Sequence, residues 1–143
     1  MLSSKKKKAF QNHHSLLSPS TRVQGDLYFT GDFYLEGSFK GNIYADEGKP
    51  AKLIVAETSV VEGEIHAPDV VINGHVRGSI HASKHIELAA KAIVEGTVYY
   101  QLIEMVKGAQ LIGGMVFSGA GMDTASATPT ELQQKKQLEV ETA

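Results

Sequence analysis

The sequence of 143 residues predicts an all-β fold, a single-stranded β-helix (solenoid) of about six short coils. Three observations predict this fold. A motif of the form apolar-x-Gly-x-apolar-aromatic or His occurs six times, apolar and polar residues alternate between the motifs, and no part of the repeat region has a helical period. The motif glycines lie 16, 22, 15, 18 and 18 residues apart, too close for a two-helix repeat or a propeller blade. They are Gly25, Gly41, Gly63, Gly78, Gly96 and Gly114.

Each coil is expected to contain about three strands. A coil of roughly 18 residues is long enough for three strands of about four to six residues joined by tight bends. A second apolar run separates successive motifs, with one residue between two apolar residues, as in half-buried strands. These apolar pairs are Phe33 and Leu35, Leu53 and Val55, Val70 and Ile72, Ile86 and Leu88, and Ile103 and Met105.

Two apolar columns run without interruption when the six motifs are aligned. In a parallel stack, equivalent residues of successive coils lie about 4.8 Å apart, so a buried core requires such columns. The first column is Val23, Phe39, Val61, Val76, Val94 and Ile112. The second column is Leu27, Ile43, Ile65, Ile80, Val98 and Val116. We expect both columns to face the core.

The column immediately before the motif glycine contains charges of alternating sign. Its members are Gln24, Lys40, Glu62, Arg77, Glu95 and Gly113. Opposite charges at strand spacing stabilise the stack by a few tenths of a kcal/mol per exposed pair, so this column favours the correct register and is not an active site. The glycine column itself marks either a bend or a close approach of two backbones, and the sequence leaves both explanations open.

Composition divides the chain into a flexible basic N-terminal arm (1–21), a β-helix domain (22–118) and a disordered C-terminal tail (119–143). The tail is too polar to offset its ordering entropy, although a short helix over 130–140 is an alternative.

The domain has a net charge of -4, which argues against a nucleic-acid groove. Cysteine is absent, which excludes disulfides and thiol chemistry. The first 20 residues contain no apolar stretch of seven or more, so we expect no signal peptide and a cytoplasmic location.

The N-terminal arm combines a few apolar residues with four consecutive lysines. Near an anionic leaflet each lysine contributes about 1 kcal/mol of binding, so one copy is held weakly and a polymer with many copies is held firmly. We therefore predict peripheral association with inner-membrane lipids, with a solubilising tail as the alternative. The predicted membrane-targeting residues are Met1, Leu2, Lys5, Lys6, Lys7, Lys8 and Phe10.

Two segments with nearly the same sequence, 61–67 (VEGEIHA) and 76–82 (VRGSIHA), lie in a run of about six such units between polar tails. This arrangement resembles the bactofilins, a family of polymer-forming bacterial cytoskeletal proteins. The resemblance covers residues 22–118. It implies a right-handed β-helix and nucleotide-independent filaments that form by end-to-end stacking. It also implies association with the inner membrane and a scaffold role for cell-wall enzymes and cell shape. The segment 46–52, which lengthens one period to 22 residues, departs locally from the repeat.

Both ends of such a solenoid expose strand edges and apolar side chains, and solenoids usually cover these ends with a polar cap. The sequence shows no candidate cap helix next to either end. We therefore predict that the chain binds copies of itself. Contacts between like ends would produce non-polar filaments, which the resemblance favours, and head-to-tail contacts would produce polar ones. The predicted interface residues are Val23, Leu27, Phe29, Ile112, Met115, Val116 and Phe117.

The six histidines suggest a metal site, because His66 and His81 share a column and His75 and His85 lie near them in sequence. The same column contains Tyr28, Tyr44, Tyr99 and Phe117, so we interpret it as a ladder of stacked rings and predict no metal ion. Glutamates such as Glu62, Glu64 and Glu95 are interpreted as surface residues of the ladders.

The enzymatic alternative is a left-handed hexapeptide-type acyltransferase, because Gly25, Gly31 and Gly37 lie six residues apart. This spacing does not continue beyond Gly37, and no long loop carries a candidate catalytic histidine. We therefore predict a scaffold rather than an enzyme, with no catalytic residue and no cofactor.

Overall fold

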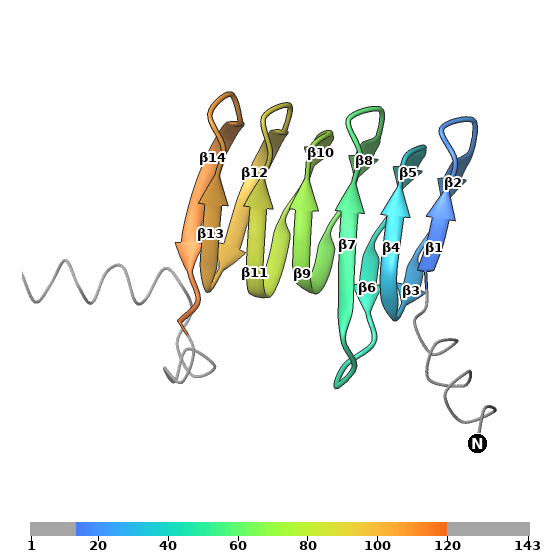
Figure 1. The fold of residues 1–143 in the computed structure, drawn as a ribbon, viewed down its shortest axis with the longest axis horizontal. Coiled ribbons are helices and arrows are strands. Elements are labelled where there is room, and N and C mark those ends of the chain that lie inside the picture. Colours follow the sequence, from blue (N-terminus) through green and yellow to red (C-terminus); the bar gives the residue numbers. More distant parts are fainter. Residues whose placement is uncertain (1–13, 120–143) are drawn as a thin grey trace, which may run out of the picture.

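The computed structural model describes residues 14–119, which form a parallel β-solenoid without a helix. Six coils are stacked along the long axis of the molecule, from β1 at one end to β14 at the other (Figure 1). Each coil contributes one strand to each of three faces, and every strand pairing is parallel. The all-β solenoid predicted from the repeat is thereby confirmed.

The three faces are named in the order in which the chain crosses them. Face 1 contains β1 (His14–Leu17), β4 (Gly31–Leu35), β7 (Ala51–Val55), the later parts of β9 (Ile65–Ile72) and β11 (Ile80–Leu88), and β13 (Leu102–Met105). Face 2 contains β2 (Arg22–Gln24), β5 (Ser38–Lys40), β8 (Val60–Glu62), β10 (His75–Arg77) and the first parts of β12 (Ile93–Tyr100) and β14 (Gln110–Phe117). Face 3 contains β3 (Leu27–Phe29), β6 (Ile43–Ala45) and the remaining parts of β9, β11, β12 and β14.

The core lies inside the three faces and consists of the inward columns. On face 2, Val61 and Val76 are fully buried, and on face 3 the same holds for Ile65 and Ile80. Face 1 adds a further inward column in which Leu35, Val55, Ile72 and Leu88 all have 0% exposure. The predicted apolar columns therefore form the core from the second coil to the fifth.

The predicted alignment of the sixth coil is wrong by one residue. Gly113, not Gly114, pairs with Gly96 in the β12 and β14 ladder. Leu111 and Met115 therefore occupy the two inward columns that the sequence alignment assigned to Ile112 and Val116. The error arose because two adjacent glycines follow two adjacent apolar residues, so both alignments preserve an apolar column.

The glycine column is a bend and a close approach at the same time. Gly63, Gly78 and Gly96 have φ of +145°, +143° and +150°, a range that L side chains rarely adopt. A Cβ atom built on Gly78 would lie 2.0 Å from the carbonyl oxygen of Gly63. Gly25, in the first coil, has the same kind of bend, but its Cβ position meets open space. A side chain in the middle of the column would therefore push two coils apart.

The solenoid begins earlier than predicted. Strand β1 pairs with β4 so that Leu17 lies beside Leu35, and His14 lies 3.6 Å from the carboxylate of Asp32. The predicted boundary of the N-terminal arm at residue 21 is therefore wrong, because residues 14–17 are part of face 1. Only the first strand of the first coil was missed, because β1 precedes the first repeat motif. The parts of the predicted tails at 1–13 and 120–143 lie outside the described residues.

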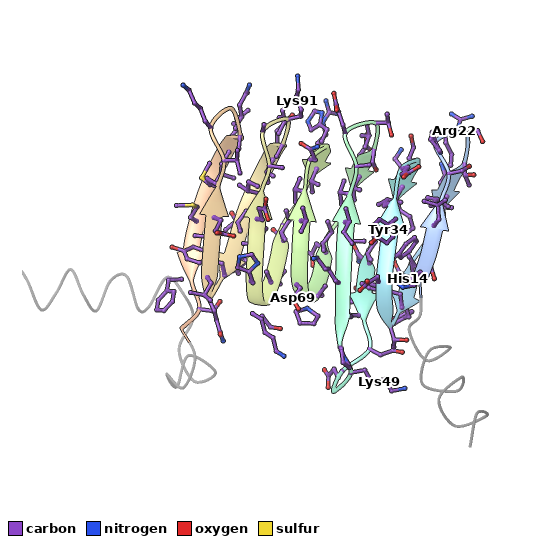
Figure 2. The ribbon with its side chains drawn as sticks, in the orientation of Figure 1. His14, Arg22, Tyr34, Lys49, Asp69 and Lys91 are labelled. Carbon is purple, nitrogen blue, oxygen red and sulfur yellow. The ribbon has the colours of Figure 1, made fainter. Side chains whose placement is uncertain are left out.

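The long period between Gly41 and Gly63 is caused by a local loop. The segment 46–50 joins β6 to β7 and extends beyond the body of the solenoid, with Lys49 at its tip (Figures 1 and 2). The ladder continues undisturbed after this loop, since Gly31 pairs with Ala51 and Leu35 with Val55. The insertion therefore changes one corner and leaves the register intact.

The six-residue glycine spacing near the N-terminus has a structural explanation. Gly25 separates β2 from β3, Gly31 begins β4, and Gly37 separates β4 from β5. These glycines stand at three successive corners of the chain path. Gly37 lies against the preceding coil, because its Cβ position would be 2.3 Å from the carbonyl oxygen of Thr21.

Candidate polymerisation interface and surface ladders

The last coil exposes apolar side chains at positions that are buried in the coil before it. Met105 is in register with Leu88 and Met115 with Val98, and both partners are completely buried. In the sixth coil the same positions are 46% exposed at Met105 and 43% exposed at Met115. Phe117 continues the column of Tyr100 and is 49% exposed. We call Met105, Met115 and Phe117 the C-terminal end patch.

The other predicted interface residues of this coil belong to outer columns. Ile112 is in register with Glu95, a member of the charged column, and Val116 is in register with Tyr99. Ile112 is 57% exposed, but on the outer surface of face 2. The structure thus separates the predicted set: Met115 and Phe117 belong to the end patch, whereas Ile112 and Val116 do not.

The first coil is less exposed at its inward positions. Val23 and Leu27 are partly buried and pack against the core, in register with Phe39 and Ile43. Phe29 is only 7% exposed and contacts the edge of the Phe33 ring, with 5.6 Å between ring centroids. Phe29 is therefore a core residue rather than an exposed interface residue. Strands β1, β2 and β3 each have a paired neighbour on one side only among the described residues.

The charged column forms a ladder of ion pairs along face 2. Lys40 lies 3.8 Å from Glu62, and Arg77 lies 3.7 Å from both Glu62 and Glu95. His75 donates a hydrogen bond of 2.6 Å from Nε2 to Glu95. All of these groups are partly exposed, so each pair contributes a few tenths of a kcal/mol. The predicted register ladder is confirmed up to Glu95, and Ile112 instead of Gly113 is its last member.

The ring column on face 3 is a continuous stack. The centroid separations are 5.0 Å from Tyr28 to Tyr44, 5.1 Å from Tyr44 to His66, 4.3 Å from His66 to His81 and 4.4 Å from His81 to Tyr99. The rings of the last two pairs are nearly parallel, at 5° between ring planes. The prediction of stacked rings is confirmed for these five residues. Phe117 is not a member, because Val116 occupies the column position in the sixth coil.

Glu64 joins two histidines of this stack into one cluster. The Nε2 atom of His66 donates a hydrogen bond of 3.0 Å to Oε1 of Glu64. This bond lowers the pKa of the Glu64 carboxyl group. The pKa of His81 is lowered mainly by partial burial and to a smaller extent by the charge of His66. The sequence interpretation treated Glu64 as a surface residue only. The available signal was the spacing Glu64-x-His66, because residues two apart in extended backbone direct their side chains to the same side.

A shallow hollow of about 850 Å³ runs beside the ring stack. Its walls include the 46–50 loop on one side and the rings of Tyr44, His66, His81 and Tyr99 on the other. The hollow is open to solvent, and none of its charged side chains among the described residues is buried. Its geometry does not indicate a catalytic site.

The predicted membrane-targeting residues Met1 to Phe10 lie outside the described residues. Within residues 14–119 no helix is long and apolar enough to cross a membrane.

Comparison with known proteins gives two matches. The family model for bactofilins, which are described as polymer-forming cytoskeletal, matches residues 15–116. Bactofilin BacO from Myxococcus xanthus (strain DK1622) is 29% identical over 102 residues, which cover 71% of this chain and 78% of BacO. No solved structure matches significantly.

Proposed function

Because the chain belongs to the bactofilin family of polymer-forming cytoskeletal proteins, we propose that its solenoids stack end to end into filaments without a nucleotide. The observation that carries this proposal is the C-terminal end patch, where three inward columns of the core emerge at the surface. A second molecule placed on this end would continue these columns. It would also cover the outer edges of β13 and β14, each of which pairs with one strand within residues 14–119.

The burial free energy is of the right order for assembly. Each half-exposed side chain of the patch contributes about 1 kcal/mol when it is fully covered, so a symmetric contact with six such side chains contributes about 6 kcal/mol. Hydrogen bonds between strand edges add to this value. The cost of association is about 4 to 15 kcal/mol, so burial of the patch offsets this cost only together with the hydrogen bonds between strand edges.

Contacts between like ends are the preferred arrangement. Exposed apolar side chains at inward positions are concentrated at the sixth coil, while the corresponding residues of the first coil are only partly exposed. A contact between two C-terminal ends brings together two copies of the more apolar surface, and such a contact has two-fold symmetry. Filaments built from like contacts at both ends have no polarity.

The test of this proposal is negative-stain electron microscopy of the purified full-length protein in buffer without nucleotide or metal. We expect long unbranched filaments. Uniform compact particles would contradict end-to-end stacking and would favour a discrete oligomer, such as that of an acyltransferase.

Filaments of this kind are proposed to lie along the inner membrane, attached through the N-terminal segment, and to position proteins that build or remodel the cell wall. The support is the sequence of the arm, which joins Met1 and Leu2 to the lysines at 5–8. A filament presents this segment many times, so binding of one arm raises the effective concentration of the next.

Replacing Lys5, Lys6, Lys7 and Lys8 by glutamine is expected to abolish binding to anionic membranes. Four lysines at about 1 kcal/mol each correspond to roughly a 1000-fold loss of affinity for a single solenoid. The measurement is co-sedimentation with vesicles rich in phosphatidylglycerol, and vesicles of phosphatidylcholine serve as the control. Equal binding of the wild-type and substituted proteins to anionic vesicles would show that the arm is a solubilising tail.

A further inference from the structure

We propose that Glu64, His66 and His81 form a binding site for a divalent transition-metal ion, with zinc as the first candidate. The site lies on the outer surface of face 3, between the third and fourth coils. One ligand atom from each of these residues lies within 4.8 Å of the other two. No other group of three histidine or acidic side chains in residues 14–119 meets this condition.

The parallel ladder brings these three side chains together. Glu64 and His66 are two residues apart, so their side chains leave the chain on the same side. His81 is in direct register with His66 on the neighbouring strand. Glu64 directly precedes β9, His66 lies on β9 and His81 lies on β11, so the three side chains lie close together outside the sheet.

The donor set suits a borderline divalent ion. Imidazole nitrogen binds zinc, copper, nickel and iron, and a carboxylate oxygen completes a facial arrangement of two histidines and one acid. Three protein ligands leave one coordination position for water or for a ligand from another molecule.

Metal binding requires a limited movement of the rings. Ligand atoms at about 2.1 Å from a tetrahedral zinc ion are roughly 3.4 Å from one another. The His66 Nε2 and Glu64 Oε1 atoms, at 3.0 Å, are close to this spacing. A bound ion would replace their hydrogen bond, with the ring proton of His66 on Nδ1 and the lone pair of Nε2 directed at the ion. The rings of His66 and His81 are parallel and 4.3 Å apart, so they must tilt toward each other to direct their nitrogens at one ion. The side chains of His66 and Glu64 are 37% and 51% exposed, which leaves space for this tilt.

Neighbouring groups hold the cluster in place. The backbone N–H of Glu64 donates to Oδ1 of Asn42 at 3.0 Å, and its carbonyl oxygen accepts from the N–H of Ile43 at 2.8 Å. The side chain of Asn42 also donates to the hydroxyl group of Tyr44, whose ring stacks on His66. Such outer contacts orient metal ligands and reduce the entropy lost on binding.

Three other histidines pair with an acid and serve as internal comparisons. His85 lies 3.0 Å from Glu104, His75 lies 2.6 Å from Glu95, and His14 lies 3.6 Å from Asp32. None of these pairs has a third ligand within reach among the described residues. They are expected to bind zinc much more weakly than the cluster, because they offer two ligands instead of three.

The test is equilibrium dialysis of the full-length protein against zinc at pH 7.5. The wild-type protein is expected to retain one zinc ion per chain, and H66Y and H81Y are expected to weaken this binding at least about 100-fold, beyond the loss typical of outer-shell changes. Tyrosine occupies the same column in other coils, so these variants keep the ring stack. E64S removes the third ligand and uses the residue found at the equivalent position in the next coil, Ser79.

H85Q is the matched control, because it removes a histidine that contacts a glutamate outside the cluster. It is expected to bind zinc as the wild-type protein does. Thermal unfolding without metal verifies that each variant is folded, and zinc is expected to raise the midpoint only where the cluster is intact. Cobalt is a second probe, since its visible absorption indicates tetrahedral nitrogen and oxygen ligation. The proposal is overturned if the wild-type protein retains no zinc at about 10 μM free ion, a weak limit for a three-ligand site, or if H66Y, H81Y and E64S bind as tightly as H85Q.

Discussion

Filaments of the Phe117→Arg variant are expected to disperse into folded particles of at most two solenoids, because only the contact between two C-terminal ends is broken. Phe117 continues an inward column beyond Tyr100, and about half of its surface is exposed because no further coil covers it in the described chain. An arginine at this position places an unpaired charge in the contact between two ends, where removal of water from the charge is costly. In an isolated solenoid the same arginine extends into solvent. Sedimentation velocity and electron microscopy measure the loss of polymer, and circular dichroism measures the retained β-structure.

Ile112→Arg is the matched control for this variant. Ile112 belongs to the same strand and has a similar exposure, 57%, but it is in register with Glu95 on the outer surface of face 2. An arginine there gains an opposite charge beside it and stays outside the end contact. We expect filaments of normal length. The end patch would be wrongly located if Phe117→Arg formed long filaments, or if Ile112→Arg dispersed them to the same extent.

Gly78→Ala is expected to destabilise the solenoid strongly, although it adds only one methyl group. The backbone at Gly78 has φ of +143°, and the added Cβ would lie 2.0 Å from the carbonyl oxygen of Gly63. The unfavourable backbone conformation costs about 1 to 3 kcal/mol. The overlap with a neighbouring backbone costs about 1 to 3 kcal/mol more, because two paired coils must separate to relieve it. The total of about 2 to 6 kcal/mol is a large part of the stability of a small domain.

Gly25→Ala separates the two contributions. Gly25 has φ of +125°, so alanine there has the same conformational cost, but no atom lies within 4 Å of the added Cβ. Its loss of stability is expected to be about 1 to 3 kcal/mol. Both substitutions are best measured by denaturant unfolding at low protein concentration in the Phe117→Arg background, where long filaments do not form. Equal destabilisation of the two variants would mean that close packing of the glycine column contributes nothing.

The repeat motif was enough to predict the middle of the solenoid. Val61, Val76 and Val94 follow one another in the sequence repeat, and they also lie in contact in the structure because parallel coils stack in register. The ion-pair ladder through Glu62, Arg77 and Glu95 was visible for the same reason. A periodic sequence maps directly onto a periodic structure, so each alignment column is also a spatial column.

The two ends were harder to predict, because the repeat is weakest there. Strand β1 has no motif, and only its pairing with β4 identifies it as part of the first coil. In the sixth coil two alignments satisfied the apolar pattern, and the positive φ of Gly113 with its pairing to Gly96 selects one of them. The proposed end patch accordingly keeps Met115 and Phe117 of the predicted residues, leaves out Ile112 and Val116, and adds Met105.

The sequence by itself therefore determined the solenoid, its core columns, the ladders on its surface and the family to which the chain belongs. These features depend on which residue types recur at a constant spacing, and spacing is fully contained in the sequence. Only the tertiary structure decided which side chains are exposed at the ends and which atoms of Glu64, His66 and His81 can reach one another. Exposure and distance depend on where neighbouring coils begin and end in space, and a repeat pattern does not contain this information.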